Sequence, residues 1–112
     1  MRQQILIPTL FDTYEIWSKR SPKMGDHIRV KRGFYAHHGI FVSDKEVIHF
    51  TGTENDSIFD WTKPEVIQSD IDYFLKGGIL EVKEYTDEEF SQLYSPEQIV
   101  AYARACIGDK GY

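Results

Sequence analysis

Residues 27–50 carry the most regular pattern in the chain, and they constrain its fold more than any other stretch. In HIRVKR, Ile28 and Val30 alternate with charged residues, and FYAHHGIFV, at residues 34–42, is rich in aromatic and β-branched side chains. After a short polar interruption comes EVIHF, at residues 46–50. Period-two alternation and short polar turns are typical of antiparallel strands. The sequence therefore predicts three antiparallel strands, the last two forming a hairpin.

Capping residues mark two helices in the second half of the chain. The stronger start is a capping box ahead of a helically periodic segment, formed by Ser95, Pro96 and Gln98, with Gly108 as a stop. A shorter helix is expected between a cap at Ser69 or Asp70 and an end at Gly77-Gly78. Strands are expected on either side of this shorter helix, in EVIQ (residues 65–68) and ILEVKEY (residues 79–85).

Near the N-terminus, apolar side chains recur at helical spacing, at Leu10, Phe11, Tyr14 and Trp17. This spacing predicts a short amphipathic helix that packs against the rest of the protein. With 112 residues, we expect one domain, with the N-terminal helix and a loop at residues 1–24 and the core at residues 25–112. The expected fold class is α+β, with an antiparallel sheet of about four to six strands and flanking helices.

The charge and apolar patterns exclude several classes of protein. The formal net charge is −5 and no run of Lys or Arg exceeds two residues, so the positive surface of a nucleic-acid-binding protein is missing. No apolar run approaches the roughly 20 residues of a membrane-spanning helix, and we expect a cytoplasmic protein. The single cysteine, Cys106, excludes an internal disulfide and a thiol-rich metal site.

Three of the four histidines lie between residues 37 and 49. Gly39 follows closely on His37, which suggests room for another group to approach this strand. His38 should point to the opposite face, and His49 lies between two apolar residues, where a buried ring needs a hydrogen-bond partner. Two alternatives to a catalytic role stay open at this point. The histidines could fill a small sheet protein, or they could bind zinc together with Asp26, Asp44 or His27.

The same residues resemble a known family. Four short motifs occur in its order, namely Gly25-Asp26, Tyr35-Ala36-His37, Asp44 and Val47-Ile48-His49. With YSPEQIVAYARACIGDKGY at the other end, the chain resembles the lecithin retinol acyltransferase-like family of permuted papain-like, NlpC-related thiol enzymes, which includes HRAS-like phospholipase/acyltransferases. The resemblance covers most of residues 25–112, and it implies a permuted papain-like fold that is incomplete here.

What the resemblance implies is a Cys-His-His active site without a cofactor or metal. His37 would be the general base and His49 the polar third member, whereas His38 would not be catalytic. A cysteine would take the acyl group of a lipid ester or amide as a thioester and pass it to water or an acceptor. Related architectures also act as cysteine peptidases, and this remains an alternative. The substrate itself is not specified by the residues.

The two histidines must share one face of the sheet for this chemistry. With a four-residue loop that pairs Val42 with Val47, His37 and His49 would point to opposite faces, because side chains alternate along each strand. We therefore predict a bulge, or a three-residue turn that pairs Val42 with Glu46.

The family's nucleophile motif, close to Asn-Cys-Glu-His-Phe, does not occur among the 112 residues. Cys106 is a poor substitute, because it falls on the apolar face and in the last turn of the predicted helix, where the dipole disfavours an anion. We expect the chain to be an inactive piece of a larger thiol enzyme. The alternatives are a pseudoenzyme that binds lipid or protein in the same pocket, and a partner that supplies the thiol. An uncovered sheet face should favour self-association.

Overall fold

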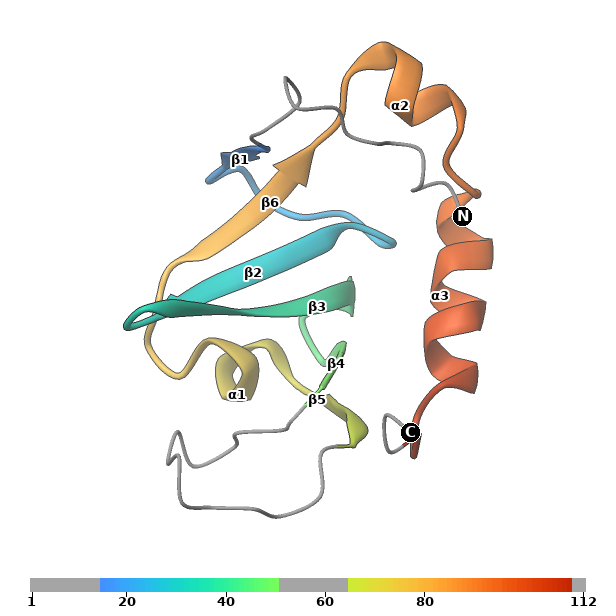
Figure 1. Cartoon of the computed structure of the whole chain (residues 1–112). Coiled ribbons are helices and arrows are strands. Elements are labelled where there is room, and N and C mark those ends of the chain that lie inside the picture. The colour runs from blue at the N-terminus through green and yellow to red at the C-terminus, as the bar shows by residue number, and fades with distance from the viewer. Residues whose placement is uncertain (1–14, 51–64, 110–112) are drawn as a thin grey trace.

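The computed structural model describes residues 15–50 and 65–109 (Figure 1). They form an α+β fold with one six-stranded sheet in the order β1-β6-β2-β3-β4-β5, and every neighbouring pair is antiparallel. The strands are β1 (Ile16–Ser18), β2 (His27–Arg32), β3 (Tyr35–Ser43), β4 (Glu46–Phe50), β5 (Val66–Ser69) and β6 (Leu80–Glu84). The helices are α1 (Ile71–Leu75), α2 (Asp87–Ser91) and α3 (Pro96–Ala105). The expected fold class and the hairpin of β3 and β4 are confirmed.

One face of the sheet, which we call the α1 face, holds the core. It carries His37 and His49 together with five core side chains, Ile28, Val30, Phe41, Val47 and Val82. Phe74 of α1 packs on these side chains, and all six core residues are at most 7% exposed. Burying apolar surface of this kind is the main stabilising contribution in a small domain. The short helix α1 is thus fixed over the middle of the sheet.

The other face, which we call the α3 face, carries His27, His38, Ile40 and Ile48. Here α3 begins with the predicted capping box, in which Ser95 and Gln98 bond each other's backbone amides. The Arg104 guanidinium donates two hydrogen bonds to the Glu46 carboxylate, at 2.7 and 2.9 Å, and this ion pair ties α3 to the start of β4. In Figure 1, α3 stands beside the ends of β2 and β3, whereas α1 lies below β3.

The prediction of an N-terminal helix is wrong where the structure can test it. Ile16–Ser18 is strand β1, which pairs with β6, and Trp17 packs its ring against His27 on the α3 face. Pairing across the sheet has overridden the helical spacing of the apolar residues. Residues 1–14, with most of that predicted helix, lie outside the described residues, as does the polar loop TGTENDS.

The predicted bulge is confirmed. Phe41 pairs with Val47 and Ser43 pairs with Glu46, so Val42 is an extra residue on β3. Gly39 consequently lies opposite His49, which places His37 on the same face as His49.

The close fit between Gly39 and α1 gives the first testable prediction. A Cβ atom at Gly39 would lie 3.0 Å from Phe74 Cε1 and 3.1 Å from Val47 Cγ1. We expect Gly39→Ala to lower the free energy of unfolding by about 1–3 kcal/mol, because the Phe74 ring must shift. Urea denaturation measures this change. The double variant Gly39→Ala/Phe74→Leu should recover part of the loss, and equal stability of Gly39→Ala and wild type would contradict the steric argument.

Candidate active site

His37 and His49 meet on the α1 face, because the bulge places both side chains on that face. His37 Nε2 lies 2.9 Å from His49 Nδ1, and the two rings are nearly perpendicular, at 82°. His49 is only 4% exposed, and its second nitrogen, Nε2, lies 2.8 Å from Ser69 Oγ on β5. His37 is half-buried. Both nitrogens of the buried ring therefore have partners, as a buried polar group requires.

The Asp70 carbonyl, which Ser69 contacts, fixes the direction of each hydrogen bond in this series. The Ser69 hydroxyl donates to the Asp70 carbonyl oxygen at 3.0 Å, because a carbonyl can only accept. Ser69 Oγ therefore accepts from the Nε2–H of His49, which leaves His49 Nδ1 as an acceptor. His37 must then donate through its Nε2–H. In a neutral His37 ring, this assignment puts the lone pair on Nδ1.

Aromatic rings of α1 cover the histidine pair. The Phe74 ring centroid lies 5.2 Å from that of His37 and 5.1 Å from that of His49, and Tyr73 lies 6.1 Å from His49. Gly39 makes this approach possible, because any side chain there would meet Phe74. The room that the sequence suggested beside His37 is thus occupied by a ring of the protein itself.

Burial keeps His49 uncharged. Loss of hydration is the largest cause that lowers the pKa of His49 to about 4, and the neighbouring His37 ring and the Arg32 guanidinium contribute to the same decrease. A neutral His49 is the form that can accept a hydrogen bond from His37 through Nδ1. The electrostatics and the hydrogen-bond directions therefore agree on the same state of the pair.

Comparison with known families gives the family of the chain. Residues 20–112 match the family model described as lecithin retinol acyltransferase. The chain belongs to the lecithin retinol acyltransferase family. A search of curated proteins returns no match. Family membership is consistent with acyltransferase or hydrolase-like function.

Cys106, the single thiol of this lecithin retinol acyltransferase-family chain, lies away from His37. It is half-buried at the end of α3 and borders a pocket with Ile40 and Ile48, which belong to the α3 face. Backbone at His49 also borders that pocket, since the His49 ring itself packs against α1. The sheet thus separates Cys106 from His37.

The zinc alternative finds no support in the described part of the chain. Within residues 15–50 and 65–109, no group of three or more His, Cys, Asp or Glu side chains is placed to hold a metal. His27 lies on the other face, and Asp26 instead bonds the Arg20 guanidinium and the Lys23 amide. Of the proposed ligands, only His37 and His49 come together.

Sequence reasoning missed a second histidine pair in this family member. On the α3 face, His27 Nε2 lies 2.8 Å from His38 Nδ1, and Trp17 packs edge-on to both rings. Burial, together with the neighbouring His38 ring, lowers the pKa of His27 to about 4. The signal was available, because a tight β2–β3 turn that pairs Arg32 with Tyr35 puts His27 and His38 on the same face.

The same reasoning missed Ser69 as the partner of His49, since only the pairing of β4 with β5 reveals it. It also missed α2, although Thr86 and Glu89 have the spacing of a capping box, which the structure shows. Among the described residues, no helix is both long and apolar enough to cross a membrane.

The lowered histidine pKa values predict a loss of stability in mild acid. The folded chain keeps His27 and His49 neutral down to about pH 4, whereas their rings in the unfolded chain take up protons below about pH 6.5. Stability should be complete above about pH 6.5 and fall as the pH decreases towards 4, by on the order of 1–3 kcal/mol per histidine. Urea denaturation across this pH range measures the slope.

Two variants separate the contributions to this slope. His49→Gln and His27→Gln should each reduce the dependence of unfolding free energy on pH, because each removes one group that takes up a proton in this pH range only when the chain is unfolded. A wild-type unfolding free energy that stays constant through this window would contradict the argument.

Proposed function

We propose that this domain is the acid–base half of a thiol-dependent acyltransferase or hydrolase, with His37 as general base and His49 as the residue that orients it. The observation that supports the proposal is the hydrogen bond from His37 to His49, inside a chain of donors that ends at the Asp70 carbonyl. Because Nε2 of His37 is bonded to His49, proton exchange with a thiol would run through Nδ1.

The reaction proceeds in two halves. His37 Nδ1 accepts the proton of a cysteine thiol, and the thiolate attacks the carbonyl carbon of a lipid ester or amide. The leaving alcohol or amine takes that proton from His37, and a thioester remains on sulfur. Water or an acceptor then gives a proton to His37 and attacks the thioester, which releases the cysteine thiolate, and the thiolate takes that proton back from His37. Throughout, His49 holds the His37 ring in one tautomer.

The nucleophile in this proposal is a cysteine other than Cys106, because Cys106 borders the pocket of the α3 face. Such a cysteine could belong to a longer form of the protein or to a partner. The 112 residues alone are then inactive, and they contribute a single domain with residues 25–112 as its core. A pseudoenzyme that only binds lipid, and a cysteine peptidase-like hydrolase, are the outcomes that the experiment below distinguishes.

Activity of the natural protein that contains these residues tests the proposal. Fatty-acid release from phosphatidylcholine vesicles, with mass spectrometry of the acid-quenched protein, detects both turnover and the thioester. His37→Gln should lower kcat/KM by about 10²–10⁴-fold, and His49→Gln by about 10–100-fold, because one removes the base and the other its orientation.

Lys45→Gln, at the exposed turn of the same hairpin, is the control and should retain activity. The 112-residue chain alone should show no turnover. Absence of any thioester in the natural protein would favour the pseudoenzyme, and release of peptide rather than fatty acid would favour the peptidase. A thioester on Cys106 that disappears in His37→Gln would overturn the separation of the two groups.

Self-association through an uncovered sheet face stays a prediction. The five core side chains of the α1 face are buried, so the described part of that face offers little apolar surface at these positions. Sedimentation velocity should detect a dimer or larger species if the prediction is right. A single monomer boundary in dilute solution would contradict it.

A further inference from the structure

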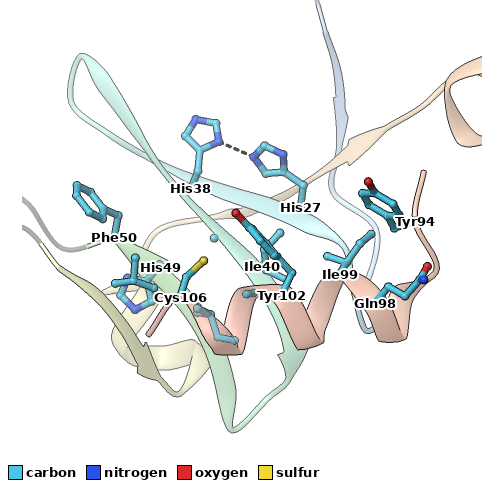
Figure 2. Close-up of a pocket in the computed structure, with 14 residues that line it drawn as sticks. His27, His38, Ile40, His49, Phe50, Tyr94, Gln98, Ile99, Tyr102 and Cys106 are labelled. Atoms are coloured by element: carbon cyan, nitrogen blue, oxygen red, sulfur yellow. Dashed lines mark hydrogen bonds between the residues drawn. The ribbon is translucent and has the colours of Figure 1, made fainter. Parts of the chain in front are cut away.

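A pocket of about 800 Å³ opens between the α3 face of the sheet and α3 itself (Figure 2). Most of its wall is apolar, with Ile40, Ile48, Phe50 and Val66 from the sheet and Ile99 and Ala103 from the helix. A volume of this size and an apolar wall with few polar groups are typical of sites for small organic ligands. The pocket lies across the sheet from His37, so it is distinct from the candidate active site.

The pocket is held open at both ends of α3. At the start of the helix, Gly25 approaches so closely that a Cβ there would lie 2.9 Å from Pro96 Cα. At the other end, the Gly108 amide donates to the Val66 carbonyl at 2.9 Å, and Arg104 pairs with Glu46. These contacts fix the helix at the pocket margins, and none of residues 15–50 and 65–109 fills the space between them. The site is therefore preformed.

The pocket is elongated along α3. Its helix wall runs from Gln98 to Cys106, which corresponds to about 12 Å at a rise of about 1.5 Å per residue. Figure 2 shows these side chains in a row along the helix, with the Cys106 sulfur directed towards the space between Phe50 and Ile40. An extended aliphatic chain matches this shape, since it can contact apolar side chains along its whole length.

The second histidine pair supplies polar groups to the wall, beside Tyr94, Gln98 and Tyr102. One proton lies between His27 Nε2 and His38 Nδ1, so in either direction the neutral pair keeps one donor and one acceptor on its two outer nitrogens. None of the described residues bonds His27 Nδ1 or His38 Nε2. The nearby cations are already paired, Arg29 with Glu81 and Lys83 with Glu15. An uncharged group that both donates and accepts, such as a hydroxyl or amide, fits this arrangement better than an anion.

We propose that this pocket binds a single-chain aliphatic molecule with an uncharged hydroxyl or amide head, whose chain lies along α3 and whose head bonds the His27–His38 pair. The inference does not depend on the acyl-transfer function, because neither His37 nor any nucleophile takes part in it.

Cys106 provides a direct test, because it lines the pocket and is the single cysteine of the 112-residue chain. We expect decanol to slow alkylation of Cys106 by iodoacetamide about tenfold once its concentration is about ten times its dissociation constant. Intact-mass spectrometry measures the rate. Ethanol, which lacks the chain, should give no protection at the same concentration, and decane, which lacks the head, should bind about 5–10-fold more weakly.

Two alanine substitutions in α3 form a matched pair. Ala103→Phe places a ring in the pocket and should abolish protection by decanol, whereas Ala101→Phe lies on the exposed side of the helix and should leave protection unchanged. His38→Leu alters an exposed residue and should weaken binding of decanol, but not of decane, by about 5–10-fold. If decanol gives no protection of the wild-type chain, or if it protects the Ala103→Phe and wild-type chains equally, the proposed site is wrong.

Discussion

The hydrogen bond that the Asp70 carbonyl accepts from Ser69 sets the state of the whole histidine pair. Because a carbonyl cannot donate, every bond upstream of it, through His49 to His37, has one permitted direction. The same carbonyl accepts a hydrogen bond from the Phe74 amide in the first turn of α1, and the Asp70 carboxylate caps that helix. Helix α1, which covers the histidines, and the hydrogen bonds that orient them therefore both depend on Asp70.

Burial and hydrogen bonding act together at His49. A histidine in water would exchange between two tautomers and a cation, but His49 has lost its hydration and has partners at both nitrogens. Its neutral form is the one that the neighbouring groups can bond. Membership of the lecithin retinol acyltransferase family gives this arrangement a chemical context, and the proposed role of His37 rests on its hydrogen bond to His49.

Local signals allowed much of this to be predicted from the sequence. The caps at Asp70 and Ser95 depend on residues a few positions apart, and the bulge followed from the requirement that His37 and His49 share a face. What could not be predicted depends on contacts between distant segments. Strand β1 exists because it pairs with β6, and Ser69 meets His49 because β5 pairs with β4. No local pattern specifies such partners, so the helical spacing around Trp17 was misleading there.

The extra residue at Val42 gives the hairpin an uneven tolerance to change. Losing Val42 would give a regular ladder with the same pairs, because Phe41 would still lie opposite Val47, whereas gaining one further residue here would turn everything before it over relative to β4. His38 would then lie on the side that His37 occupies now, and Gly39 would no longer make room for an aromatic ring. Relatives of this protein should thus vary in residue type at this point, or lack the residue, far more readily than they gain one.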